Sequence, residues 1–389
     1  MKTAQSLDTL FHRAEQFNKT LVDLVAPMDE LRCESEGDSM LLHVGDYSGP
    51  LTDSAFAQTC RSLKIPVEYA TRCLEGSYEI AGEPLPRAPI IAAHMNHWLR
   101  NPVKNANKLV RGIDMSMYHD LDHDLSWRAV LSDHYFPFDS FDMLREAMKV
   151  CSDLPNRFGK PQWASGEITP DRMFAKITFP GMERPIKSSR PGDMIRWGLY
   201  LENNEIGGGK WRARGFGEFT VCTNGIVSTR VLRDADGNKL QYERRHVGSK
   251  LAIDTEAGIQ WGDETRADAK RLQLSILRDT IAHILDPATL DTEIRIFENA
   301  AANDLRVVDG EKAIKRLAND QTLSDEESKQ ILHSFLADGD STQFGLAQAI
   351  CSDRVARTLS YDRATAFERL AYNVIALPRR EWSALALAA

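Results

Sequence analysis

Cationic residues recur at every second position in the most regular stretch of the chain. Lys210, Arg212 and Arg214 alternate with Trp211 and Ala213, which is the period-two pattern of a half-buried strand. Three cations on one side of a strand repel one another unless an anion or acidic neighbours lie opposite them. The pattern therefore predicts either a binding face for a polyanion or a sheet face held by salt bridges.

The flanking residues extend this pattern into a sheet. Residues 195–202 also alternate, residues 203–209 are rich in turn-forming Asn and Gly, and Asn224-Gly225 is typical of a tight hairpin. We expect an antiparallel meander of about four strands here. The residues expected to contact nucleic acid are cations for the phosphates and one tyrosine for base stacking: Arg196, Tyr200, Lys210, Arg212, Arg214, Arg230, Arg244 and Arg245. Trp197 and Trp211 point to the opposite side of their strands, which suits core packing better than stacking.

The charge distribution favours a focused basic face. Residues 184–250 contain thirteen Lys and Arg against seven Asp and Glu, a net charge of +6, whereas the whole chain carries −8 and the remainder therefore −14. An acidic protein with a basic centre is not expected to bind nucleic acid over its whole surface.

Other groupings of polar residues are weaker candidates. Residues 207–210 read Gly-Gly-Gly-Lys, but Trp211 stands where a phosphate-binding loop needs Ser or Thr, and Asn204 replaces its first glycine. We therefore expect a flexible connection between strands. His94 and His97 lie three apart on a predicted helix, a spacing that some metal sites use, without a third ligand nearby in the sequence.

An acidic and histidine-rich segment is a further metal candidate. Residues 119–124 contain two His and three Asp, which would suit a divalent cation in phosphodiester chemistry. The segment lies between two predicted strands, however, where a polar surface loop is normal. We assign no metal, no cofactor and no catalytic residue.

The order of patterns predicts an α+β fold with three regions. Residues 1–105 are expected to be mainly helical, beginning with an amphipathic helix over residues 6–25. Residues 106–260 are expected to form a central curved antiparallel β-sheet with flanking helices, and residues 261–389 an all-helical C-terminal region.

Composition limits the class of protein. No apolar run reaches the roughly 18 residues of a membrane span, and the N-terminus lacks the apolar segment of a signal peptide. We expect a cytoplasmic protein, in the host cytoplasm if it is phage-encoded. The six cysteines form no Cys-x-x-Cys pair, so we expect small core residues or free thiols.

Several segments resemble a phage- and plasmid-associated family catalogued as domain of unknown function 932. The similar segments are residues 51–66, the sequence WRAVLSDHY at 127–135, the core at 192–227 and the Arg-His-Val-Gly element at 245–248. The resemblance covers residues 40–250 and the C-terminal region loosely, and it implies a mobile-element setting. A curved sheet with helices on one side is also the layout of the phage annealases, an analogy at the level of the fold.

These observations lead to three functional hypotheses. The first is a DNA-metabolism accessory protein that binds single-stranded DNA through the basic sheet face and anneals strands as a homo-oligomer. The second is a phage-encoded protein that engages a host protein and mimics the charge of DNA. The third is a metal-dependent phosphoesterase that uses residues 119–124 or His246. Because we find no catalytic signature, we favour a protein that is not an enzyme.

Overall fold

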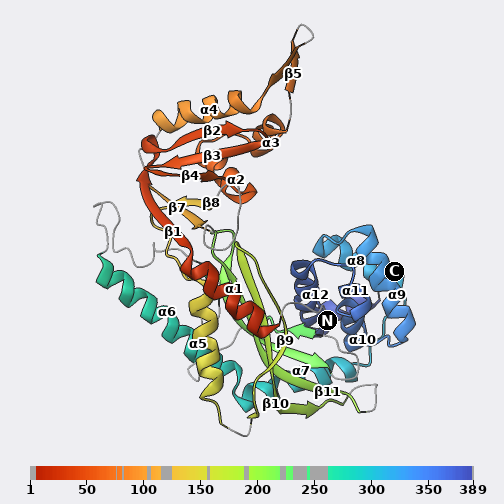
Figure 1. The fold of residues 1–389 in the computed structure, drawn as a ribbon. Helices are drawn as coiled ribbons and strands as arrows, with labels where there is room; N and C mark the ends of the chain where they lie inside the picture. The colour runs from red at the N-terminus through yellow and green to blue at the C-terminus, as the bar shows by residue number, and fades with distance from the viewer. Residues whose placement is uncertain are drawn as a thin grey trace.

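The computed structural model describes residues 6–75, 77–80, 83–102, 107–114, 125–155, 158–187, 192–219, 225–230, 243–245 and 262–387. It has a mixed α+β N-terminal region with antiparallel sheets, followed by an all-helical C-terminal region (Figure 1). The fold class expected from the sequence is therefore confirmed.

The upper lobe in Figure 1 is built from small antiparallel sheets and short helices. One sheet has the order β1-β7-β8, a second β2-β3-β4, and β5 pairs with β6. The elements are α1 (Leu7–Lys19), β1 (Leu21–Pro27), η1 (Met28–Glu30), β2 (Arg32–Glu36), β3 (Ser39–Val44), β4 (Tyr47–Pro50), α2 (Asp53–Ser62), α3 (Val67–Leu74), β5 (Ser77–Ile80), β6 (Glu83–Pro86), α4 (Ala88–Arg100), β7 (Asn107–Asp114) and β8 (Leu125–Ser132). The lobe's sheet and core include β7 and β8.

The prediction of one helix over residues 6–25 is wrong for residues 20–25. Helix α1 ends at Lys19, and β1 begins two residues later and pairs with β7 along its whole length. Leucines at 21 and 24 fit a helical stripe as well as a strand, so the local pattern is ambiguous. Pairing with β7, a partner distant in sequence, decides in favour of the strand.

The central sheet is six-stranded, with the order β13-β12-β11-β10-β9 and β14 also paired to β12. Its elements, preceded by α5 (Ser140–Ser152), are β9 (Gln162–Ile168), β10 (Arg172–Pro185), β11 (Met194–Asn204), β12 (Lys210–Phe219), β13 (Gly225–Val227) and β14 (Glu243–Arg245). The predicted antiparallel meander is thus confirmed for β11, β12 and β13, whereas β14 pairs with the start of β12. Its Asn224-Gly225 turn begins outside the described residues.

Eight helices complete the chain: α6 (Asp263–Ile284), α7 (Pro287–Ala302), α8 (Gly310–Gln321), α9 (Asp325–Asp338), α10 (Gln343–Ile350), α11 (Asp353–Ala356), α12 (Tyr361–Ile375) and α13 (Arg379–Ala386). Helix α9 begins with a capping box, in which Ser324 and Glu327 satisfy each other's backbone N–H groups.

The two faces of the central sheet are covered by different helices. One face packs Trp197, Leu199 and Trp211 into the main core together with α1, α5, α6 and α7. The other face packs Phe174, Tyr200 and Phe216 against Tyr361 of α12. The C-terminal helices therefore cover part of the face on which the cations were predicted.

A buried ionic cluster joins the upper lobe to the central sheet. The Arg111 guanidinium of β7 contacts the carboxylates of Asp23 and Asp139, each at 2.8 Å, and donates to the backbone oxygen of Glu205. Arg128 of β8 contacts the Glu205 carboxylate at 2.8 Å. Because breaking one partner of such a pair strands a buried charge, the cluster fixes the two parts against each other.

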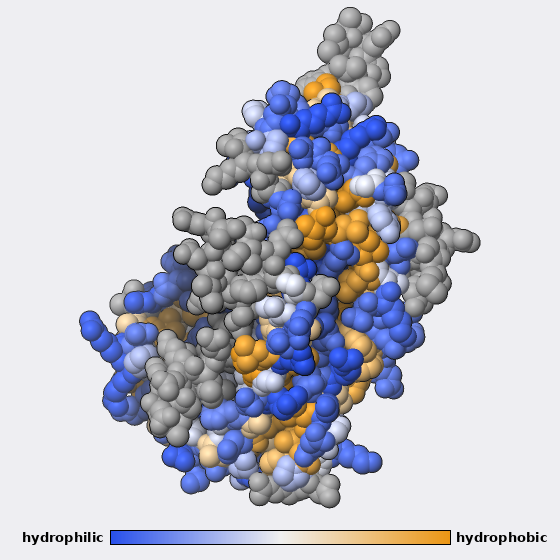
Figure 2. All heavy atoms as spheres, turned by 90° about the vertical axis from the view of Figure 1, so that its left-hand side faces the viewer, coloured by the Kyte–Doolittle hydropathy of each residue, from blue (hydrophilic) through white to orange (hydrophobic). Residues whose placement is uncertain are grey.

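The described residues hold five buried free cysteines and no helix long and apolar enough to cross a membrane. Burial raises the pKa of Cys33 to about 12, so this thiol stays protonated and serves as a small core residue. Seen from the side that faces left in Figure 1, the surface is largely hydrophilic, with separate hydrophobic patches from mid-height down to the base (Figure 2).

Candidate nucleic-acid interface

Strand β12 carries the row of cations that the sequence predicted. Lys210, Arg212 and Arg214 project from the side opposite Trp211 and Ala213, which are fully buried in the main core. All three cationic residues are half-buried. The predicted alternation of β12 is therefore present in the fold.

Acidic neighbours face part of this row. The ladder pairs Arg212 with Glu202, and the two side chains approach to 2.6 Å. Helix α12 adds Arg369, which contacts the same carboxylate at 2.9 Å. The Glu202 carboxylate thus forms ion pairs with two guanidinium groups, which share its single negative charge.

The register of β14 adds further cationic residues. Lys210 is the cross-strand partner of Arg245, Trp211 of Arg244, and Arg212 of Glu243. Like-charged residues directly opposite each other weaken a sheet unless an anion compensates them. The register thus places Arg245 and Glu243 at positions on the face of the β12 cations, whereas Arg244 is paired with Trp211 at a position on the other face.

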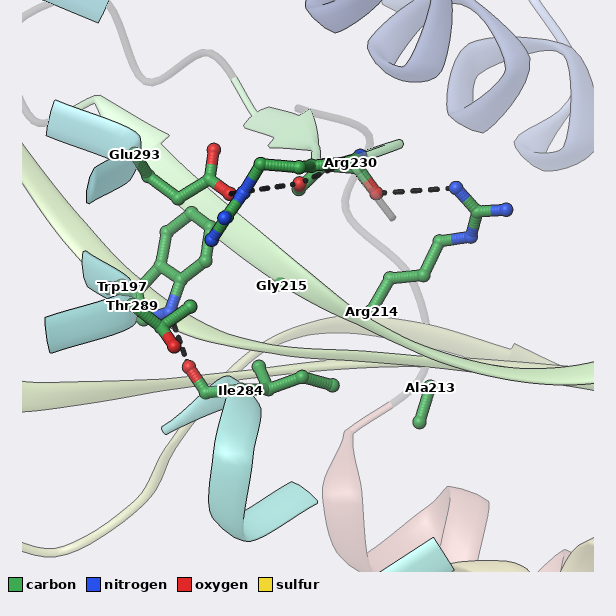
Figure 3. Close-up of a pocket in the computed structure, with 9 residues that line it drawn as sticks. Trp197, Ala213, Arg214, Gly215, Arg230, Ile284, Thr289 and Glu293 are labelled. Carbon is green, nitrogen blue, oxygen red and sulfur yellow. Dashed lines mark hydrogen bonds and ion pairs between the residues drawn. The ribbon is translucent and has the colours of Figure 1, made fainter. Parts of the chain in front are cut away.

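Between β13 and β14, the edge of β12 borders a small cavity (Figure 3). Its volume is about 10 Å³, which is room for about one water molecule. Arg214 and Arg230 both line it, and Arg214 donates to the backbone oxygen of Ser228 at 3.3 Å. The structure thus brings together two predicted contact residues that are sixteen positions apart in the sequence.

Arg230 is held by a buried acid, Glu293, that the sequence analysis did not select. Glu293 of α7 has no exposed surface, accepts from Arg230 Nε at 2.6 Å and accepts from the Tyr372 hydroxyl at 2.7 Å. Ser228 also donates to this carboxylate. This arrangement neutralises Arg230 and ties the end of β13 to α7 and α12.

Arg196 lies on β11, away from the row, and is compensated. It contacts Glu183 at 3.1 Å and Glu218 at 3.6 Å, and its side chain is 28% exposed. Two carboxylates for one guanidinium make this end of the face the less favourable one for an anion. Here the structure matches the salt-bridged alternative.

The expectation that Tyr200 stacks on a base does not agree with its position. Its ring is fully buried against Phe174, and its hydroxyl donates to Glu202 at 3.2 Å. The physical reason is that α12 covers this part of the sheet face. Trp197 is 1% exposed and donates to the Ile284 backbone oxygen, so it too belongs to the core.

A buried ion pair holds α12 on the sheet. Lys176 of β10 and Glu368 of α12 approach to 2.7 Å and are almost completely buried. Burial alone would lower the pKa of Lys176, but the Glu368 carboxylate raises it above the usual lysine value. The Tyr361 hydroxyl shares a hydrogen bond with Ser165 beside this pair.

The other sequence candidates that lie among the described residues show no binding geometry. His94 accepts a hydrogen bond from Trp98 on the same helix, and the described residues hold no cluster of metal-ligating side chains. Residues 119–124 and His246 lie outside the described ranges. In the loop before β12, the Asn204 side chain accepts from the Gly208 N–H, a contact that closes a turn.

Sequence reasoning could not select Arg369, Glu293 or Lys176 for this site. Arg369 and Glu293 lie on helices with ordinary amphipathic patterns, far from β12 in the sequence. Lys176 occupies a core position on β10 that a charged residue rarely takes. No protein-family model, no curated protein and no solved structure matches the chain, so the resemblance described above stays a prediction.

Proposed function

We propose that this protein binds single-stranded DNA through phosphate contacts along a basic row, defined as Lys210, Arg212 and Arg214 of β12 with Arg369 of α12. The observation that carries the proposal is the sharing of one carboxylate, Glu202, by two arginines of the row. The pairing of Lys210 with Arg245 adds to it. The phosphates of a bound strand would contact these cations along β12 and α12.

The geometry of the row favours one strand of nucleic acid over a duplex. Alternate residues of a β-strand lie about 7 Å apart along a single line. Such a line follows one extended polyanion, whereas a duplex presents two backbones around a helix. Since the aromatic residues Tyr200, Trp197 and Trp211 are buried, binding is expected to depend little on base identity.

The acidic surface of the rest of the chain limits affinity. With a net charge of −8, the protein repels DNA except at a local basic site. Four phosphate contacts to a single strand predict a slope of about −3 in a plot of log affinity against log salt. Binding is therefore expected to be measurable at ~50 mM salt and to weaken about 50-fold by ~200 mM.

Fluorescence anisotropy with a labelled oligonucleotide tests this proposal. The double variant Lys210→Ala/Arg214→Ala should weaken binding at least tenfold, because it removes two phosphate contacts. Arg196→Ala is the matched control, since that arginine already contacts two carboxylates. No binding by the wild type at ~50 mM salt, or equal losses in both variants, would contradict the proposal.

A further inference from the structure

A half-open cavity of about 260 Å³ lies in the C-terminal helical region. Its walls come from α8, α12, α13 and the turn that joins α12 to α13. Spaces between the helices of a bundle are common binding sites, and pockets for drug-sized molecules measure roughly 300–1,000 Å³. The cavity therefore suits a ligand smaller than a drug-sized molecule.

The apolar part of the lining is aliphatic. It consists of Leu317, Leu370, Val374, Leu377 and Leu385. All except the half-buried Leu377 are buried members of the main core, so packing behind them holds this wall in place. An aliphatic group that enters the cavity would lose contact with water against a preformed surface.

The polar part of the lining carries an excess of negative charge. Asp320 of α8 and Glu381 of α13 are exposed. Within the part of the chain that the structure describes, neither carboxylate has a hydrogen bond or an ion pair. Arg316, the cation of the lining, donates instead to the backbone oxygen of Ala384 at 3.0 Å. One positive and two negative charges thus leave the lining with a net negative charge.

From this combination we infer that the cavity binds a small organic cation, in which an aliphatic body carries a protonated amine. The body would contact the aliphatic wall, and the ammonium group would pair with Asp320 and Glu381. A protein partner would need a far larger contact, since stable protein interfaces bury more than about 1,000 Å². The inference is independent of the proposed nucleic-acid binding, because no residue of the basic row lines the cavity.

Saturation-transfer difference NMR on the full chain tests the inference. The probes are octylammonium, 1-octanol and octanoate, which share one aliphatic body and differ in charge. Octylammonium should bind about fivefold more tightly than 1-octanol, because two exposed ion pairs contribute modestly, and octanoate should bind most weakly. Hexylammonium should bind roughly tenfold more weakly than octylammonium, since it buries two fewer methylene groups.

A substitution that fills the cavity locates the site. Ala384 lines the cavity and is exposed, so Ala384→Phe should place a ring in the space and abolish binding of octylammonium. Ala337→Phe is the matched control, since Ala337 is exposed on α9 and does not line the cavity. Circular dichroism shows whether each variant is folded.

Removal of the two carboxylates tests the choice of a cation. Asp320→Asn/Glu381→Gln should weaken octylammonium binding about fivefold and leave 1-octanol binding unchanged. Glu264→Gln/Glu311→Gln is the matched control, because it removes the same charge from exposed positions outside the lining. No binding of octylammonium by the wild type at ~5 mM, equal affinities for the three probes, or binding unaffected by Ala384→Phe would overturn the inference.

Discussion

Replacement of Glu202 by Gln separates a structural from a binding role at the basic row. The carboxylate makes two ion pairs, at 2.6 Å to Arg212 and 2.9 Å to Arg369, and its side chain is 14% exposed. A neutral amide keeps the shape but loses both charge interactions. At about 0.5–1 kcal/mol for each partly exposed pair, the free energy of unfolding should fall by about 1–2 kcal/mol.

The same substitution should strengthen binding to DNA. A phosphate on the far side of the Arg212 guanidinium would lie roughly 7 Å from the carboxylate that the variant lacks. Two unit charges at that distance repel by about 0.6 kcal/mol in a water-like dielectric and by about 2.4 kcal/mol at an effective dielectric constant of 20. Affinity should therefore rise at least about threefold while stability falls.

Urea denaturation and anisotropy on the same preparations measure both effects. Glu183→Gln is the control, because that carboxylate faces Arg196 outside the row. A Glu202→Gln protein that binds DNA no better than the wild type, yet remains folded, would show that the cations of the row do not meet phosphate.

Four further predictions concern helix α12 and the residues that it contacts. Glu368→Leu should lower the free energy of unfolding by about 3–5 kcal/mol because it leaves Lys176 buried without its carboxylate, and adding Lys176→Met should recover most of that loss in urea denaturation. The folded-state pKa of Lys176 is raised, so the Lys176–Glu368 pair contributes fully to the free energy of unfolding below the ordinary lysine pKa. This contribution should vanish as pH rises through the folded-state pKa. Unfolding measured as a function of alkaline pH tests the prediction. A hydrogen bond from Arg363 lowers the pKa of Glu327 to about 2. The contribution of this ion pair to the free energy of unfolding should therefore be complete above the ordinary glutamate pKa and lost as pH falls towards 2. Glu327→Gln should flatten that part of the acid unfolding curve and lower the free energy of unfolding by about 1 kcal/mol. Tyr200→Phe should cost about 1 kcal/mol of stability and leave DNA affinity within twofold, because the ring is buried.

The fold follows from the sequence wherever one local pattern outweighs the others. The alternation in β11 and β12 and the helical stripes of α6 and α7 predict those elements because each has a single buried face. Residues 21–27 fit two periodicities, and only the pairing with β7 decides between them. Local pattern cannot supply that partner.

The candidate site is predictable only in part. The cations of β12 follow from alternation, but their compensation depends on contacts distant in sequence, such as Glu202 with Arg369 and Arg230 with Glu293. Tyr200 shares a face with the cations, as expected, yet α12 buries it. A strand pattern defines the side of a sheet but not the element that packs on it.

The salt dependence of single-stranded DNA binding tests the central claim most directly. Anisotropy titrations from ~50 to ~200 mM salt should give a log–log slope of about −3 for the wild type and about −1.5 for Lys210→Ala/Arg214→Ala, since each lost phosphate contact removes about 0.7 from the slope. Arg196→Ala should keep the wild-type slope. If the double variant also keeps it, the bound phosphates do not contact the basic row and the proposed interface is wrong.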